Sequence, residues 1–302
     1  MKRTEAFDFY QPATLQEASQ LLKDNGPGGR FLAGGTDLVI AMKEKGLLPK
    51  YIVDLKRVPG LSGIRENSDG SIAIGALTTL YTIETSALIK KKYPFLAQSA
   101  AEVGSIQIRN RATIGGNISN ASPSADTSPA LVALGVTATI ASASGERKIP
   151  VEEFFKGPGQ SVMNADEILT EITIPKTAAN LVGEYIKFSP REMMDLAYVG
   201  VAAVYNLAAD KKCTGVRIVL GAVAPTPIRA KRAEAVLEGQ ILSEALAEKA
   251  GQTAAEEAKP ISDVRSSADY RRAMVGTMTK RALLNAATGP AKSWYDRRDR
   301  RY

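Results

Sequence analysis

Two glycine pairs, each placed after a run of β-type residues, constrain this chain more than any other feature. They lie in "FLAGGTDLV" at 31–39 and "ATIGGNISN" at 112–120, and a short polar residue follows each pair. Glycine reaches positive φ and leaves no Cβ in the way of a ligand. Successive amides in such a turn form a nest that binds anions. The pattern predicts two tight turns whose bare backbone approaches an anion such as a pyrophosphate.

A simpler interpretation of the same turns is that both are ordinary hairpin or bulge glycines without a ligand. If a ligand is present, short side chains beside the glycines add hydrogen bonds to phosphate, ribitol or ribose oxygens: Thr36, Asp37, Thr113 and Asn117. The chain has no G-x-G-x-x-G, and "GRFLAGGT" at 29–36 places Gly35 where a P-loop needs lysine. The turns therefore predict anion-binding backbone that is neither Rossmann nor P-loop.

The residue types that usually carry catalysis are scarce. The chain contains no histidine and a single cysteine, Cys213. It cannot build a Ser-His-Asp triad, a histidine-based zinc site or a self-contained iron–sulfur cluster. We therefore expect no catalytic residue and no metal site on this chain, and we expect any redox chemistry to belong to a bound cofactor or a partner chain.

Composition narrows the class of protein further. The 302 residues are 44% hydrophobic and 24% charged, which is typical of a globular protein. No apolar run approaches the roughly 18 residues that a membrane span needs. The start "MKRTEAFDFYQPATLQEA" lacks the apolar core of a signal peptide, so we expect a cytoplasmic protein. The formal charge of +7 is dispersed along the chain, which disfavours nucleic-acid binding.

Periodicity and turn signals predict an α+β fold. A helix follows the capping-box pattern of Thr14 and Glu17, a hairpin turns at Asp69-Gly70, and one helix runs through "YTIETSALIKK" at 81–91. The last third is predicted to form antiparallel strands in "YIKFSP", "AYVGVAAVYNLA" and "GVRIVLGAVAP". Helices follow around 243–257 and 269–287, the second introduced by Ser266.

Taken together, "AGGTDL" and "TIGGNISNASPSADTSPALVALG" resemble the FAD-binding (medium) subunit of the molybdenum hydroxylase family, of xanthine dehydrogenase and carbon monoxide dehydrogenase type. The resemblance extends over nearly the whole chain, through "FDFYQPATLQEA", "LGAVAPTPIRA" and "YRRAMVGTMTKRAL". It implies a flavin domain of the vanillyl-alcohol-oxidase (PCMH) type with two subdomains, 1–57 and 58–176. A C-terminal antiparallel sheet with helices, 177–288, and a basic tail, 289–302, complete the expected organisation.

The resemblance also implies how FAD is bound. The first loop would wrap the pyrophosphate with backbone amides, and the second would follow the phosphates and the ribityl chain. Asp126 would accept hydrogen bonds from sugar or ribityl hydroxyls, Lys187 would lie near the pyrimidine edge of the flavin, and Leu196 would lie beside its ring. The implied cofactor-binding residues are Phe31, Leu32, Ala33, Gly34, Gly35, Thr36, Asp37, Leu38, Thr113, Ile114, Gly115, Gly116, Asn117, Asp126, Leu169, Lys187 and Leu196.

Two of these positions have plainer interpretations, and two further positions bear on the ligand. Lys187, in an alternating strand, is equally compatible with a solvated face, and Asp126 with an Asx turn before "TSP". Val103 stands where some relatives stack an aromatic ring on the adenine. Leu196 leaves the flavin face accessible, which suits NAD⁺ without deciding the acceptor.

The family resemblance implies partners as well as a cofactor. A large subunit would carry the molybdopterin cofactor, and a small subunit would carry two [2Fe–2S] clusters that reduce the FAD. NAD⁺ or another acceptor would reoxidise it, in a dimer of heterotrimers. The alternatives are a stand-alone flavin oxidoreductase and a non-catalytic flavin-binding assembly subunit. The tail, with Trp294, Tyr295 and Tyr302 between arginines, fits either a disordered end or an anchor on a partner.

Overall fold

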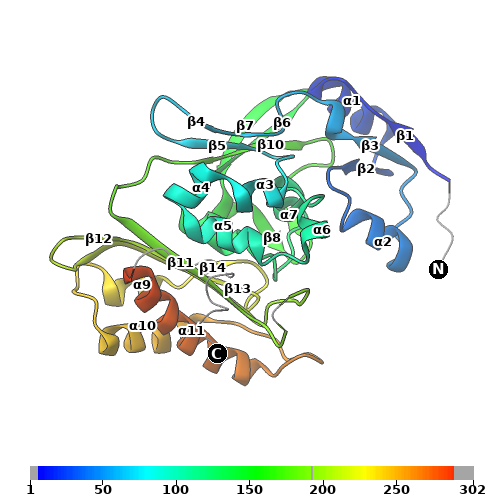
Figure 1. Ribbon diagram of the computed structural model, residues 1–302. Coiled ribbons are helices and arrows are strands. Elements are labelled where there is room, and N and C mark those ends of the chain that lie inside the picture. The colour runs from blue at the N-terminus through cyan, green and yellow to red at the C-terminus, as the bar shows by residue number, and fades with distance from the viewer. Residues whose placement is uncertain (1–5, 192, 289–302) are drawn as a thin grey trace.

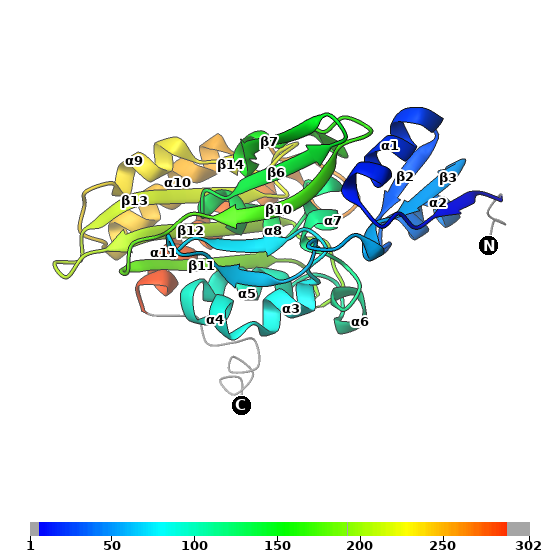
Figure 2. The same cartoon turned by 90° about the horizontal axis from the view of Figure 1, so that it is seen from above.

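A computed structural model describes residues 6–191 and 193–288. Those residues form sheets of three, five, four and two strands with helices between and beside them, which confirms the α+β class. In Figure 1 the five-stranded sheet, a layer of short helices, the four-stranded sheet and a final layer of helices follow one another from top to bottom. Figure 2 shows that the small N-terminal sheet lies at one end of this stack.

The N-terminal sheet is parallel and has the strand order β1-β3-β2. Its first helix begins at Thr14, whose hydroxyl accepts the N–H of Glu17 at 3.1 Å, so the predicted cap is confirmed. That helix ends at Gly26, where φ is +74°. The elements are β1 (Asp8–Tyr10), α1 (Leu15–Asn25), β2 (Gly29–Leu32), α2 (Leu38–Glu44), β3 (Tyr51–Asp54) and η1 (Leu55–Arg57).

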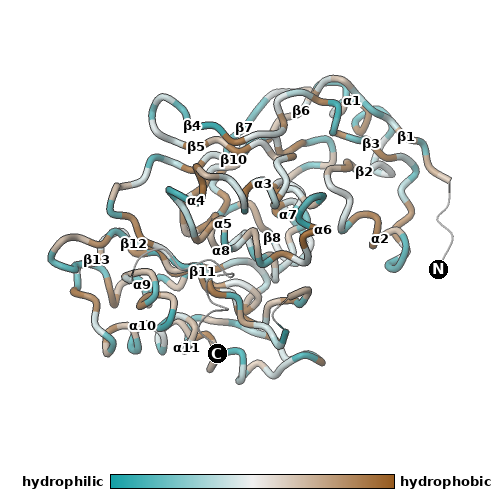
Figure 3. The backbone as a smooth tube through the Cα atoms, in the orientation of Figure 1, coloured by the Kyte–Doolittle hydropathy of each residue, from teal (hydrophilic) through white to brown (hydrophobic). Residues whose placement is uncertain are grey.

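The five-stranded sheet is antiparallel, with the order β4-β5-β10-β6-β7. The predicted hairpin is present: Oδ1 of Asp69 accepts the N–H of Ser71 at 2.9 Å, and the loop joining β4 to β5 is polar, teal in Figure 3. The strands are β4 (Ile64–Glu66), β5 (Ile72–Gly75), β6 (Thr137–Ser142), β7 (Gly145–Pro150) and β10 (Ile168–Ile174).

Short helices cover one face of this sheet. The single helix predicted over 81–91 is wrong, because the hydroxyl of Ser86 accepts the N–H of Ile89 and starts a new helix there. The helices are α3 (Leu80–Thr85), α4 (Ala87–Lys92), α5 (Pro94–Ala101), α6 (Ile106–Arg109), α7 (Ile114–Ser119) and α8 (Thr127–Ala133). A 3-10 turn η2 (Val151–Glu153) and the small hairpin of β8 (Phe155–Gly157) and β9 (Gln160–Ser161) lie between β7 and β10.

The last third forms the predicted antiparallel sheet, covered by helices. Sequence reasoning missed α9, and α11 is capped by Ser267 rather than Ser266, since the Ser267 hydroxyl accepts the N–H of Tyr270 at 3.2 Å. The elements are β11 (Leu181–Phe188), β12 (Val199–Leu207), β13 (Cys213–Gly221), β14 (Ile228–Arg229), α9 (Lys231–Leu237), α10 (Glu244–Glu257) and α11 (Ala268–Ala287).

Strand β12 separates two hydrophobic cores. Ala202 and Val204 pack with the five-stranded sheet and its helices, whereas Val201, Ala203 and Tyr205 pack against α9, α10 and α11. Side chains of a strand alternate between its faces, so an uninterrupted apolar strand can serve both cores at once. Packing on both faces of β12 thereby holds the four-stranded sheet against the layer of short helices.

The three larger sheets fall within the predicted parts 1–57, 58–176 and 177–288, although the boundaries themselves stay a prediction. The basic tail predicted at 289–302 lies outside the described residues. No helix in the described part of the chain combines the length and the apolar character that a membrane crossing requires.

Candidate functional site

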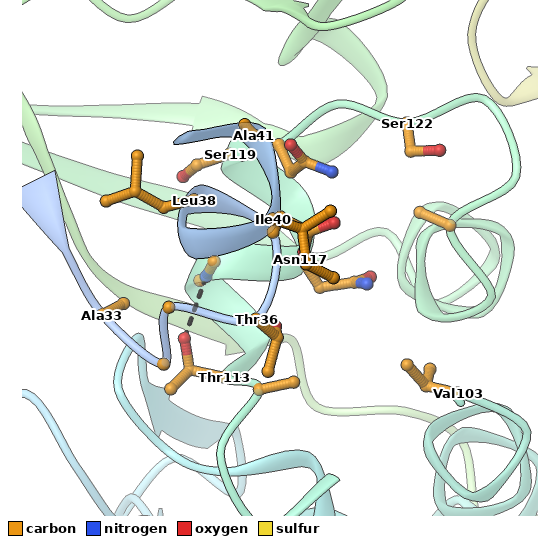
Figure 4. A pocket seen from close by; sticks show the side chains of 18 of the residues that line it. Ala33, Thr36, Leu38, Ile40, Ala41, Val103, Thr113, Asn117, Ser119 and Ser122 are labelled. Carbon is orange, nitrogen blue, oxygen red and sulfur yellow. Dashed lines mark hydrogen bonds between the residues drawn. The ribbon is translucent and has the colours of Figure 1, made fainter. Parts of the chain in front are cut away.

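A cavity of about 710 Å³ lies between the N-terminal sheet and the layer of short helices. Its volume is within the range of roughly 300–1,000 Å³ typical of small-molecule sites. Both glycine pairs contribute to its wall, and Figure 4 shows side chains next to them, among them Ala33, Thr36, Thr113 and Asn117. The predicted site residues that line it are Phe31, Ala33, Gly34, Gly35, Thr36, Asp37, Leu38, Thr113, Gly115, Gly116, Asn117, Asp126, Leu169 and Leu196.

Three predicted residues do not line the cavity. Leu32 is the last residue of β2, Ile114 is fully buried in the core, and Lys187 lies behind Asp126, which does line it. These residues can reach a ligand only through their backbone or through a neighbour. Most of the predicted cofactor-binding residues thus line this one cavity.

The first glycine loop joins β2 to α2 and has the form predicted for an anion-binding turn. Gly35 has φ +80°, and no polar group of the described residues accepts a hydrogen bond from the backbone N–H groups of residues 34–38. Unpaired backbone N–H groups are rare in folded proteins unless water or a ligand accepts them. This loop therefore offers consecutive free donors beside the cavity.

Gly34 holds this loop against the second one. A Cβ at this position would overlap the carbonyl oxygen of Arg111 and lie 3.0 Å from the Cα of Ala112. Only a glycine allows the backbone of the β2–α2 loop to touch the chain that leads into α7. At this contact the β2–α2 loop of the N-terminal sheet meets the turn between α6 and α7 in the helical layer.

The second glycine pair differs from the prediction. Gly115 and Gly116 lie inside α7, not after a strand, and neither has positive φ. The hydroxyl of Thr113 accepts the N–H of Gly116 at 3.1 Å (Figure 4), while the N–H of Gly115 donates to the oxygen of Ala76 at 2.8 Å. The β-branched pair Thr113-Ile114 favours a strand locally, but the threonine acts as a helix cap.

The amides of the second pair are therefore already paired, and its glycines serve another purpose. A Cβ at Gly115 would lie 2.6 Å from the Cβ of Ala76, so glycine is needed for α7 to pack closely on the chain after β5. At Gly116 a Cβ would lie 3.0 Å from Oγ1 of Thr113 and 3.8 Å from the Cβ of Ala33. The second position keeps the space between the two loops open.

Polar side chains of the wall also have fixed orientations. Oδ1 of Asn117 accepts the hydroxyl of Thr127 at 2.6 Å, so its amide nitrogen is the group left for a ligand. Asp37 precedes α2 without capping it. Neither Thr36 nor Asp37 donates or accepts a side-chain hydrogen bond within the described residues, so both remain available to a ligand.

A buried charged cluster adjoins the cavity through Asp126. Nζ of Lys187 lies 2.9 Å from Oδ2 of Asp126 and 2.9 Å from the backbone oxygen of Glu102. The hydroxyl of Tyr185 donates to Oδ1 of Asp126 at 3.0 Å. Burial raises the pKa of the Asp126 carboxyl to about 6, although the Lys187 ammonium and the Tyr185 hydroxyl both act to lower it.

These contacts contradict two of the plainer interpretations. The side chain of Lys187 is 5% exposed, so it does not lie on a solvated face. Asp126 makes no side-chain hydrogen bond to the start of α8, so it is not an Asx-turn residue. Both side chains belong to this buried cluster, in which Asp126 lines the cavity and Lys187 lies behind it.

Apolar side chains form much of the rest of the wall, among them Val103, Ile108, Leu169 and Leu196. Leu169, in β10, is 5% exposed, whereas Leu196 is 45% exposed. A flat aromatic ring can lie between such side chains without leaving polar groups unpaired.

Sequence reasoning missed several residues of the site. Tyr185 lies two residues before Lys187 and therefore on the same face of β11, a spacing that could have revealed it. Met194 also lines the cavity, with φ +57°, and nothing in its surrounding sequence signals that position.

Similarity to known protein families defines the class of protein to which the chain belongs. Residues 5–177 match the family described as the FAD binding domain in molybdopterin dehydrogenase. Residues 184–286 match the CO dehydrogenase flavoprotein C-terminal domain. The chain belongs to the family of FAD-binding flavoprotein subunits of molybdopterin dehydrogenases, as its paired glycine motifs predicted.

Individual relatives are similar over almost their full length. The 6-hydroxypseudooxynicotine dehydrogenase complex subunit alpha of Paenarthrobacter nicotinovorans is 35% identical, over 93% of this chain and 94% of its own. The xanthine dehydrogenase FAD-binding subunit of Escherichia coli O157:H7 is 34% identical, over 93% and 97%. The solved carbon monoxide dehydrogenase from Hydrogenophaga pseudoflava matches with a TM-score of 0.91 and 33% identity, over 95% of this chain and 99% of that one. Membership in this family makes the chain an oxidoreductase component.

Proposed function

We propose that this chain binds FAD in the cavity and passes electrons through it as the flavoprotein subunit of a molybdenum hydroxylase. The observation that carries the proposal is the β2–α2 loop, whose free N–H groups at 34–38 line the cavity. A pyrophosphate carries negative charge that such donors bind without a cation. The cavity and its donor set fit a dinucleotide with a flat ring at one end.

The charges of the wall are compatible with an anionic ligand. Asp126 is paired with Lys187, Glu167 with Arg147 and Asp195 with Arg191. Each of these three carboxylates is thus largely neutralised before a ligand arrives, which limits its repulsion of the pyrophosphate. Asp37, which lines the same cavity, has no ion-pair partner among the described residues and is the one carboxylate of the wall that opposes an anion. Arg30 lines the same cavity and adds positive charge near the start of the loop.

We assign the parts of FAD to the parts of the wall as follows. The amides of 34–38 and the hydroxyl of Thr36 hold the pyrophosphate, and the amide nitrogen of Asn117 and the carboxylate of Asp126 bind the hydroxyls between pyrophosphate and ring. Leu169 and Leu196 contact the ring itself. When bound, FAD supplies a two-electron acceptor that can also exchange single electrons with a metal cluster.

We further propose the electron path that the family resemblance implies. Electrons arrive from two [2Fe–2S] clusters on a small partner subunit, which a large molybdopterin subunit reduces, and leave to NAD⁺ or another acceptor. The absence of histidine and the single cysteine support this division of labour, because the chain lacks ligands for such clusters of its own. The dimer of heterotrimers and the cytoplasmic location stay predictions.

Reconstitution tests the cofactor. The purified full chain, stripped of flavin and titrated with FAD, is expected to bind one equivalent and to show a flavin absorption spectrum. A chain that stays colourless after reconstitution would overturn the proposal.

Partners and acceptor need separate measurements. Molybdenum and iron in the complex that co-purifies with the chain distinguish a hydroxylase subunit from a stand-alone flavin oxidoreductase. Under anaerobic conditions NADH is expected to bleach the flavin of that complex if NAD⁺ is the acceptor. A flavin that is reduced neither by NADH nor by clusters that dithionite has reduced would indicate a non-catalytic assembly subunit.

A further inference from the structure

The Asp126 carboxylate is held by two donors from one strand. Tyr185 and Lys187 are two residues apart in β11, so both side chains leave the same face of the strand. The Tyr185 hydroxyl donates to Oδ1 at 3.0 Å and the Lys187 ammonium to Oδ2 at 2.9 Å. Each oxygen of the carboxylate thus has its own donor, and the plane of the group is fixed relative to the cavity that Asp126 lines.

The neighbouring strand leaves room for this arrangement. Gly200 of β12 pairs with Lys187 in the register of the sheet. A Cβ at Gly200 would lie 3.2 Å from the hydroxyl oxygen of Tyr185, closer than most carbon–oxygen contacts allow. A side chain at residue 200 would therefore push the hydroxyl away from its position by a few tenths of an ångström.

We infer, on the basis of the proposed FAD site, that Tyr185 is a positioning residue. Its hydroxyl orients the Asp126 carboxylate so that the remaining lone pairs of that carboxylate face the hydroxyls of the cofactor. An ionised carboxylate accepts about four hydrogen bonds, and β11 supplies two. The remaining acceptor sites are available on the cavity side. Tyr185 itself is 1% exposed and does not line the cavity, so it acts through Asp126.

The electrostatic surroundings determine how this role can be detected. The Lys187 ammonium and the Tyr185 hydroxyl, both of β11, act on the Asp126 carboxyl, and Glu102 after α5 acts on Tyr185. Burial raises the pKa of Tyr185 well above 10, so the phenol keeps its proton and remains a donor. Because its hydrogen bond stabilises the ionised carboxylate, removing the hydroxyl raises the pKa of Asp126 above its value of about 6.

Tyr185→Phe tests the inference through the pH dependence of FAD binding. Titration of the full-length apoprotein with FAD between pH 5 and 8 is expected to show weaker binding as Asp126 becomes protonated, with a midpoint near 6 in the unmodified protein. In Tyr185→Phe the midpoint should rise by about one pH unit. FAD affinity should then fall by up to about tenfold below pH 6 and change little at pH 8.

Tyr205→Phe is the matched control. Tyr205 is also fully buried, and its hydroxyl donates to the oxygen of Leu283 at 2.7 Å in the other core. Both variants lose one buried hydroxyl hydrogen bond, but only Tyr185→Phe should move the midpoint. Equal shifts in both variants, or no shift in Tyr185→Phe, would overturn the inference.

Two further variants keep the outcome interpretable. Asp126→Asn should abolish the titration between pH 5 and 8, and a midpoint that persists would contradict the assignment to Asp126. If Tyr185→Phe does not fold, Gly200→Ala displaces the hydroxyl instead and should shift the midpoint in the same direction by a smaller amount. Failure of the unmodified chain to bind FAD at any pH would instead overturn the proposed function.

Discussion

The ammonium of Lys187 and the carboxylate of Asp126 form an ion pair of 2.9 Å with side chains that are 5% and 7% exposed. Removing one partner of a buried pair leaves a charge without compensation and costs about 3–5 kcal/mol. Lys187→Met should therefore lower the free energy of unfolding by about 3 kcal/mol. The double variant Lys187→Met/Asp126→Asn should recover most of that loss. Urea unfolding of the apoproteins measures both, and an additive double variant would contradict the coupling.

Asp126 also makes stability depend on pH. Its pKa rises from the ordinary 3.8 to about 6 on folding, so between these values the folded state holds more protons than the unfolded state. The contribution of the Asp126 carboxyl to the free energy of unfolding therefore falls as pH rises from 4 to 6, by up to about 3 kcal/mol. Other carboxylates titrate in the same range, so the difference between the wild type and Asp126→Asn is the quantity to measure. A constant difference across pH 4 to 6 would refute the raised pKa.

Gly116→Val should weaken FAD binding by at least about tenfold. Its side chain would enter the space between Thr113 and Ala33 that the two loops leave open. Gly157→Val is the control, because a Cβ there meets only the side-chain oxygen of Gln160 at 3.8 Å and φ is not positive. Fluorescence titration with FAD compares them. Equal affinities would show that the space at Gly116 is not part of the site.

Gly34→Ala should both destabilise the chain and reduce FAD affinity, because the added Cβ overlaps the carbonyl of Arg111 and forces the two loops apart. We expect a loss of about 2 kcal/mol, the scale of other steric and backbone defects. Gly276→Ala in α11 provides the comparison, since its nearest contact would be 3.5 Å and alanine favours helices by about 1 kcal/mol. If Gly34→Ala unfolds and binds FAD like the wild type, the loops do not meet as described.

Much of this fold was predictable because it follows from local pattern. The capping box at Thr14, the hairpin at Asp69-Gly70 and the strands of the last third are each encoded within a few residues. The first glycine loop was predictable for the same reason. Positive φ and free amides follow from the glycines and the short polar residues around them.

The features that could not be predicted depend on contacts between residues that are distant in the sequence. The hydrogen bond between Tyr185 and Asp126 joins residues 59 apart, so no local pattern encodes it. The β-branched residues 113 and 114 favour a strand, yet the cap on Gly116 and the packing of Gly115 against Ala76 start a helix there. In such places the tertiary environment overrides local propensity.

The contact of Gly34 with Arg111 has a consequence for when the cavity comes into existence. Its wall combines residues of the N-terminal sheet with residues of the helical layer, so the unfolded chain, and a chain whose N-terminal sheet has come away, lack a binding site. Whatever fills the cavity binds only the assembled state and adds its binding free energy to the cohesion between the two parts. At a free concentration one hundred times its dissociation constant, that contribution is about 2.7 kcal/mol. A chain loaded with its cofactor would therefore resist separation of its N-terminal sheet from the helical layer more strongly than the empty chain.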